Sequence, residues 1–180
     1  MSRIGRLPID VPAGVTVTIE GNKVTVAGKL GTLSQVIDRN ISAKLENNQV
    51  IVTRASENGE CRAKHGLYRQ LIANMVKGVS EGFKKVLVIN GVGYKATQNG
   101  NKVVLNIGLS HPVELVPDEG ITLKATSVTE VEVSGIDKER VGQFAAKVRD
   151  IKRVEPYHAY VIEYSDEVVI RKEGKTSGKK

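Results

Sequence analysis

Gly21-Asn22-Lys23-Val24 recurs as Gly100-Asn101-Lys102-Val103, at an offset of 79 residues. In the first copy the Gly-Asn pair separates two stretches in which apolar and polar residues alternate, which is typical of a β-hairpin with a two-residue turn. The register continues beyond the hairpin, because Leu30 falls on Leu109 at the same offset. The chain of 180 residues is therefore predicted to contain two diverged copies of one unit, joined near Gly78–Gly82.

Each copy is predicted to hold antiparallel strands followed by one helix. The expected strands span 15–19, 23–26, 32–37 and 49–53 in the first copy, and 85–89, 102–107, 113–116, 121–125 and 130–134 in the second. Apolar residues at helical spacing, from Ala63 to Met75 and from Val141 to Ile151, predict the two helices, the second behind Asp137 as its N-cap. One face of a sheet and one stripe of a helix must bury each other. The predicted fold class is therefore α+β, with two tandem duplicated domains, each an antiparallel sheet packed against one helix.

The repeat also predicts the domain boundaries. We expect an N-terminal α+β repeat over 1–81, a C-terminal α+β repeat over 82–152, and a C-terminal extension with a basic tail over 153–180. Gly66 and Gly142 fall early in the two expected helices, where glycine costs about 1 kcal/mol relative to alanine. A close approach between helix and sheet is the expected compensation at both positions.

The net charge of +7 arises from 27 Lys and Arg against 20 Asp and Glu. Residues 1–80 hold 11 basic and 6 acidic groups, residues 81–150 hold 9 of each, and the last ten residues hold five basic groups and one acidic group. A basic balance favours a polyanionic partner but does not identify one. No apolar run is long enough for a membrane span. The single cysteine, Cys61, excludes an intrachain disulfide and favours a reduced, cytoplasmic location.

The sequence contains no arrangement of residues that is typical of an enzyme active site. Cys61 and His65 lie one helical turn apart, but two potential ligands without a third make a poor zinc site, so a surface or half-buried pair is expected. The carboxylate pairs Asp118-Glu119 and Asp166-Glu167 are interpreted as solvated charges in turns. No motif for a catalytic serine, a phosphate-binding loop or a zinc protease is present. We therefore expect no enzyme activity, no metal, no cofactor and no small-molecule substrate.

The segment Gly91-Val-Gly93-Tyr94-Lys95 superficially resembles a dinucleotide-binding fingerprint. That motif requires a helix after the glycines, whereas here another strand pattern follows. Two interpretations remain, with equal weight. The segment is either a flexible connection between strands, or a loop whose glycines let backbone amides, Tyr94 and Lys95 approach a nucleic-acid backbone.

The C-terminus combines aromatic and basic residues. Three tyrosines, Tyr157, Tyr160 and Tyr164, precede the basic residues Arg171, Lys172, Lys175, Lys179 and Lys180. Rings that can stack on bases and cations that can meet phosphates suit ordering on RNA. Two alternatives stay open. Tyr160, Ile162 and Tyr164 could form one face of a strand packed on the second copy, and the basic tail could simply be solvated.

Four stretches together resemble one protein family. They are Met1-Ser-Arg-Ile-Gly-Arg-Leu-Pro-Ile9, the helical segment Gly66-Leu-Tyr-Arg-Gln-Leu-Ile-Ala-Asn-Met-Val-Lys-Gly-Val79, the loop Gly91-Val-Gly-Tyr94, and Glu155-Pro-Tyr157. In this order the chain is similar to the bacterial large-subunit ribosomal proteins of the L six family, from residue 1 to 180.

The resemblance implies two similar α+β domains and a structural role in the large ribosomal subunit. It also implies binding to large-subunit (23S-type) rRNA near the factor-binding centre, among neighbouring large-subunit proteins, with the second domain and the tail against the RNA. The residues to which the RNA-binding role is carried over are Gly91, Gly93, Tyr94, Lys95, Tyr157, Arg171, Lys172 and Lys175, with Lys179 and Lys180 in the same tail. A free-standing RNA-binding regulatory protein of the same fold is the alternative.

One segment departs from the family pattern. After Glu-Pro-Tyr the family usually continues Lys-Gly-Lys-Gly-Ile-Arg-Tyr, whereas this chain has His-Ala-Tyr-Val at 158–161 and then Ile162-Glu163-Tyr164. Because this segment has the higher β propensity, 158–161 is predicted to form a strand packed on the second domain. The lost cations and the added Glu163 predict weaker phosphate contacts there.

Overall fold

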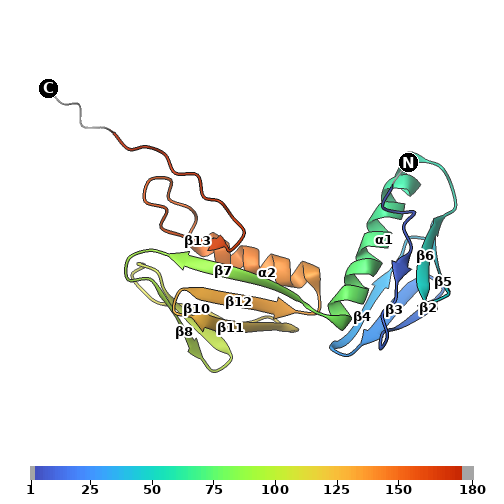
Figure 1. Cartoon of the computed structure of the whole chain (residues 1–180), viewed down its shortest axis with the longest axis horizontal. Helices are drawn as coiled ribbons and strands as arrows, with labels where there is room; N and C mark the ends of the chain where they lie inside the picture. The colour runs from blue at the N-terminus through green and yellow to red at the C-terminus, as the bar shows by residue number, and fades with distance from the viewer. Residues whose placement is uncertain (1–2, 176–180) are drawn as a thin grey trace. The chain divides into compact units, whose positions relative to one another are not determined.

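The computed structural model describes residues 3–175, which form two compact units (Figure 1). The first unit runs to Phe83 and includes Ile136–Lys138, and the second comprises Lys84–Gly135 and the chain from Glu139 onward. The first contains β1 (Ile9–Asp10), β2 (Thr16–Glu20), β3 (Lys23–Gly28), β4 (Gly31–Val36), β5 (Ile41–Glu46), β6 (Gln49–Arg54) and α1 (Gly59–Ser80). The second contains β7 (Phe83–Asn90), β8 (Lys95–Asn99), β9 (Lys102–Asn106), β10 (Val113–Leu115), β11 (Ile121–Ser127), β12 (Glu130–Gly135), α2 (Lys138–Ile151) and β13 (Val161–Tyr164).

The two units share one strand order. In the first unit the strands form two three-stranded sheets, ordered β1-β6-β5 and β2-β3-β4, and α1 packs against strands of both. The second unit repeats this arrangement as β7-β12-β11 and β8-β9-β10, and β13 adds to the free side of β7. The α+β class and the tandem duplication are confirmed, with the strands of each unit divided between two small sheets.

Gly-Asn turns close equivalent hairpins in the two units, of which the first was predicted. Gly21 and Gly100 both have φ of 58°, a left-handed conformation that glycine adopts without steric cost. Glu20 pairs with Lys23 in the first hairpin, and the second hairpin has the same register. Since side chains alternate along a strand, this register sets which residues of β2 and β8 face the core.

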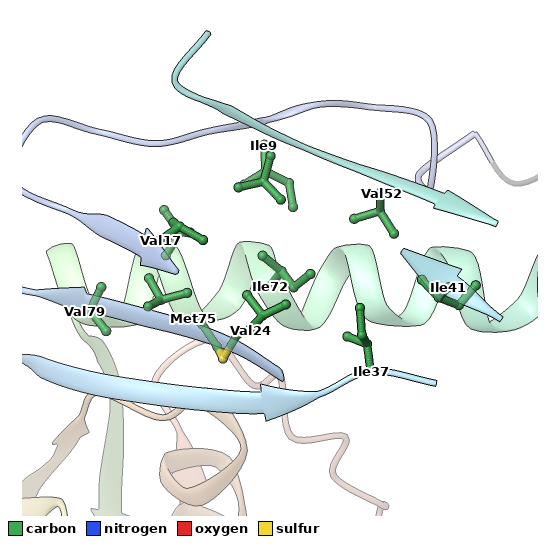
Figure 2. Packing of buried hydrophobic residues seen from close by; sticks show 12 residues of the cluster. Ile9, Val17, Val24, Ile37, Ile41, Val52, Ile72, Met75 and Val79 are labelled. Atoms are coloured by element: carbon green, nitrogen blue, oxygen red, sulfur yellow. The ribbon is translucent and has the colours of Figure 1, made fainter. Parts of the chain in front are cut away.

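The core of the first unit lies between α1 and the two sheets (Figure 2). Ile72 and Val79 from α1 are completely buried and belong to one cluster with Val17 and Val24 from the hairpin. Burial of one such aliphatic side chain stabilises the fold by about 1.5–3 kcal/mol. The apolar residues from Ala63 to Met75 were expected to line one buried face of the helix, and this is wrong for Leu67, which is 54% exposed.

Three strands were not predicted: β1, β5 and β8. β1 is only two residues long, and β8 has the polar sequence Lys-Ala-Thr-Gln-Asn, so neither carries an apolar alternation that could be recognised. β5 buries only Ile41 fully, and its remaining residues are half-buried or exposed. In each case pairing with a neighbouring strand fixes the conformation, and local sequence does not.

The predicted strand over 158–161 is wrong for three of its four residues, because β13 begins at Val161. Ala159 has φ of 57°, outside the β region, and its N–H donates to the carbonyl of Glu155 at 3.0 Å. The turn closed by this bond keeps residues 158–160 out of the sheet. From Val161 the strand pairs with β7, and both Val161 and Ile162 are completely buried.

The expected close approach of helix and sheet is wrong at Gly142, where a Cβ would meet nothing within 4 Å. A close approach is found at Gly78, near the end of α1, but its partner is the segment between β12 and α2 and not a strand. A Cβ at Gly78 would lie 2.0 Å from the carbonyl oxygen of Ile136, a residue of the same unit. Only glycine fits at that point of the helix.

Candidate nucleic-acid interface

The predicted loop over 91–95 connects β7 to β8, so no helix follows its glycines and the dinucleotide fingerprint is excluded. The loop closes as a turn in which the Tyr94 N–H donates to the carbonyl of Gly91 at 3.2 Å. Position 93 favours glycine because its φ of 75° is a conformation that other residues rarely adopt. Position 91 needs glycine because a Cβ there would lie 2.3 Å from the Tyr94 ring.

The Tyr94 ring is half-buried and anchors the loop. On one side it lies against Gly108, where a Cβ would approach it to 3.0 Å. The Tyr160 ring lies 6.0 Å away at an interplanar angle of 55°, and the Lys152 ammonium lies 6.0 Å from the ring centroid. Tyr94 therefore joins the 91–95 loop to the segment that follows α2, while Lys95 beside it remains exposed.

The turn after α2 is organised by Glu155. Its carboxylate accepts hydrogen bonds from the backbone N–H of His158 at 2.5 Å and of Tyr157 at 3.2 Å, and contacts His158 Nδ1 at 3.1 Å. These donors favour the ionised carboxylate, and the bond from the His158 N–H contributes most to lowering the pKa of Glu155. The turn presents two rings to solvent. Tyr157 is 54% exposed, and the exposed His158 ring stacks on Tyr160 at 5.5 Å.

The basic tail returns to this turn. The backbone N–H of Lys172 donates to the carbonyl of Pro156 at 2.8 Å, which brings the tail beside Tyr157. Arg171, Lys172 and Lys175 are exposed, and within residues 3–175 their side chains make no hydrogen bond or ion pair. Lys179 and Lys180 lie outside the described residues. We call Tyr157, His158, Arg171, Lys172 and Lys175 the turn–tail surface.

An ion pair that was not predicted holds the segment between β13 and the tail. Arg149 on α2 binds both carboxylate oxygens of Glu167, with Nε to Oε2 at 2.9 Å, and the backbone N–H of Tyr164 donates to Oε2 at 3.3 Å. The Arg149 guanidinium also lies 5.8 Å from the Tyr164 ring centroid. These bonds lower the pKa of Glu167, with the Arg149 hydrogen bonds as the largest cause. The interpretation of Glu167 as a solvated charge is wrong.

The departure at Glu163 also has a local partner. The side-chain amide of Asn90, at the end of β7, donates to the Glu163 carboxylate. An arginine at position 163 could not accept that bond. The sequence offered no signal for this pairing, since Asn90 and Glu163 become neighbours only through the pairing of β7 with β13.

The Cys61–His65 pair is buried, and the expected surface or half-buried location is wrong. His65 Nδ1 lies 3.2 Å from the Arg54 guanidinium, so it accepts, which leaves Nε2–H to donate to the Val52 carbonyl at 2.9 Å. Within residues 3–175 no three metal-ligating side chains come together, and no described helix is long and apolar enough to cross a membrane.

Comparison with known proteins assigns a family to the whole fold. The family model described as Ribosomal protein L6 matches residues 11–82 and 90–165, one segment in each unit. The chain is 52% identical over 176 residues to the large ribosomal subunit protein uL6 of Halalkalibacterium halodurans, covering 98% of this chain and 99% of the relative. It is 53% and 54% identical to the uL6 proteins of Lachnoclostridium phytofermentans and Clostridium botulinum, over the full length of both chains in each case.

Proposed function

The chain belongs to the ribosomal protein L6 family, and from this premise we propose that its second unit and tail bind large-subunit rRNA near the factor-binding centre. Its family makes it a structural protein of the large ribosomal subunit and not an enzyme. The resemblance of its motifs supports the finer assignment to rRNA and to the factor-binding centre. Neighbouring large-subunit proteins are its other expected partners.

One observation carries the proposal: the bond from the Lys172 N–H to the Pro156 carbonyl brings unpaired cations beside exposed rings. Arg171, Lys172 and Lys175 have no carboxylate to neutralise within the described chain, so phosphates can take that place. Tyr157 and His158 offer faces on which unpaired bases can stack. Phosphate contacts then position the protein on the RNA, and the rings engage bases that are splayed out.

The residues of the 91–95 loop have different parts in this proposal. Lys95 is exposed and supplies a phosphate contact. Tyr94 is half-buried and fixes the loop against Tyr160, so its contribution is to position the interface. Gly91 accommodates the Tyr94 ring, and Gly93 with open space around it permits a close approach of RNA to the backbone. The tail residues Lys179 and Lys180 are assigned to the same interface on composition alone.

The alternative is a free-standing RNA-binding regulatory protein of the same fold. Cosedimentation with large subunits at moderate salt separates the two, because a structural constituent stays with the particle at one copy per subunit. Cross-linking in native particles, mapped by residue, then tests the interface. Adducts between rRNA and Lys95, Tyr157 or Lys172 support the proposal, and adducts confined to the first unit contradict it.

A further inference from the structure

The first unit contains a groove between β2 and β5, each of which is an edge strand of one of its two sheets. The groove has a volume of about 510 Å³ and is lined by Val17, Thr18, Ile19, Ala43, Lys44, Leu45 and Glu46. Val17 belongs to the buried core, Ile19 and Ala43 pack against that core, and Leu45 is exposed. The two charged side chains of the groove, Lys44 and Glu46, have opposite signs.

Backbone groups of both strands also point into this groove. Each hairpin has a two-residue turn, so the backbone groups of the residue just before the turn bond to the partner strand. From that residue back along the strand, the N–H and C=O groups alternately face the partner strand and face away from it. By this alternation the N–H and C=O groups of Val17, Ile19, Ala43 and Leu45 face away from their partner strands. Within residues 3–175 no hydrogen bond to these outward groups is found. The groove therefore has two unpaired strand edges as its walls.

The equivalent gap in the second unit is closed by the chain itself. The side-chain amide of Gln98 on β8 accepts from the Ala125 N–H at 2.8 Å and donates to the Leu123 carbonyl at 3.5 Å. The Ala96 N–H donates to the Val128 carbonyl at 2.7 Å. The Gln98 side-chain amide thus satisfies two groups on the edge of β11, and the Ala96 bond ties β8 to the turn that follows β11.

The first unit has no such closure. At the repeat offset of 79, Ile19 stands where the second unit has Gln98. By β5 and β11 the offset has grown to 80, since Ile41 falls on Ile121, and there Ala43 and Leu45 stand where the second unit has Leu123 and Ala125. The Ile19 side chain has neither donor nor acceptor, so the edge of β5 stays open. A ligand that replaces Gln98 must offer an N–H and a C=O side by side.

We propose that the groove between β2 and β5 binds an extended segment of a neighbouring large-subunit protein. Its peptide groups, which carry the same donor and acceptor as the Gln98 amide, bond to the edge of β5, and its apolar side chains contact Val17 and Ile19. The apolar lining and the balanced charges of Lys44 and Glu46 favour a polypeptide over a polyanion. This inference rests on membership of the large subunit and is independent of where the rRNA binds.

The test places a benzophenone photo-cross-linking residue at Leu45, which is 47% exposed, in assembled large subunits. The expected product is an adduct with another protein, identified by mass spectrometry. The same probe at Val36, 63% exposed on β4 and outside the groove, gives the background. Ile19→Gln supplies the missing amide within the chain and should abolish the adduct. Thr16→Gln, an exposed position on the same strand outside the groove, should retain it.

Hydrogen exchange keeps the test decisive if a variant assembles poorly. In wild-type protein the Leu45 N–H should exchange roughly tenfold more slowly in the particle than in the free chain, because it gains a hydrogen bond there. In free Ile19→Gln the same N–H should already be slow. An adduct with rRNA alone, no protein adduct above the Val36 background, or equal exchange in particle and free chain overturns the proposal.

Discussion

The backbone N–H of Lys172 donates a 2.8 Å hydrogen bond to the carbonyl of Pro156, and this bond ties the basic tail to the turn that follows α2. Glu155 orders the same turn through the N–H groups of Tyr157 and His158. The tail cations therefore start from a fixed point on the second unit and do not leave the fold at random. The two kinds of contact proposed with rRNA, electrostatic and stacking, can therefore be separated by mutation.

Replacing Arg171, Lys172 or Lys175 singly with Ala should weaken rRNA binding uniformly across sequences. Each lost phosphate contact should lower the magnitude of the slope of log K against log salt by about 0.7–0.9. Filter binding or fluorescence anisotropy over a salt series measures it. Lys77→Ala, at an exposed cation of the first unit, should leave the slope unchanged. Unchanged slopes for all three tail variants would show that the tail is solvated.

Replacing Tyr157 with Ala should reduce affinity by about 1–3 kcal/mol through lost base stacking, at an unchanged salt slope. Tyr157→Phe retains the ring and should keep most of the affinity. The same salt series measures both quantities, and the affinities of the variants are compared at one reference salt concentration. Equal affinity of the Ala and Phe variants would contradict the stacking role.

The fold could be predicted from the sequence because the patterns that indicate its turns and helices are local and occur once in each repeat. Gly21 and Gly100 mark equivalent turns, and both helices carry apolar residues at helical spacing. The sequence could suggest the proposed interface only where its residues lie in one stretch, as Arg171 and Lys172 do, and its contacts with RNA stay a prediction. The pairing of Arg149 with Glu167 depends on how β13 packs beside α2, and the conformation of Ala159 depends on a hydrogen bond to the backbone carbonyl of Glu155, four residues away. Neither relationship has a periodic pattern that a sequence could reveal.

Glu167→Gln should remove a pH-dependent part of stability. Arg149 lowers the pKa of Glu167 below its ordinary value of 4.5, so the ion pair contributes above that pH and its contribution is lost as pH falls through the lower folded-state pKa. Wild type should exceed the variant in denaturant midpoint at pH 7, and the difference should vanish in acid. Asp166→Asn is the matched control, since the more exposed Asp166 meets Lys85 only at 3.5 Å. A difference that is constant with pH would refute the assignment.

Alanine at Gly78 and at Gly142 should have opposite effects on stability. At Gly78 the added Cβ would lie 2.0 Å from the Ile136 carbonyl oxygen, so the backbone must shift, at a cost of about 1–3 kcal/mol. At Gly142 the Cβ enters open space, and alanine should stabilise α2 by about 0.5–1 kcal/mol. Chemical denaturation of the free protein measures both. Destabilisation by Gly142→Ala would restore the expectation of a close approach there.

Restoring the usual family residues in the segment 158–163 should strengthen rRNA binding only if Val161 is kept. Val161 is completely buried in β13, and glycine there removes a core side chain at a cost of about 2 kcal/mol or more. Ala159→Gly is compatible with the fold, because its φ of 57° favours glycine. The informative variant therefore combines His158→Lys, Ala159→Gly, Tyr160→Lys and Glu163→Arg.

This four-residue variant gains three permanent cations and loses one anion, at the cost of the Tyr160 contact with Tyr94 and the Asn90 bond to Glu163. If the RNA passes this segment as in the usual family pattern, each cation that meets a phosphate should raise the salt slope by about 0.7–0.9, and binding should tighten at low salt. Glu163→Arg alone separates the charge effect from the loss of Tyr160. The measurement is binding to a large-subunit rRNA fragment over a salt series, with thermal unfolding as the check on folding. A folded variant that binds no better would mean that Tyr160 and Glu163 serve a different local interface. On this turn, Tyr157 would then be the last residue to which the RNA-binding role of the family is carried over.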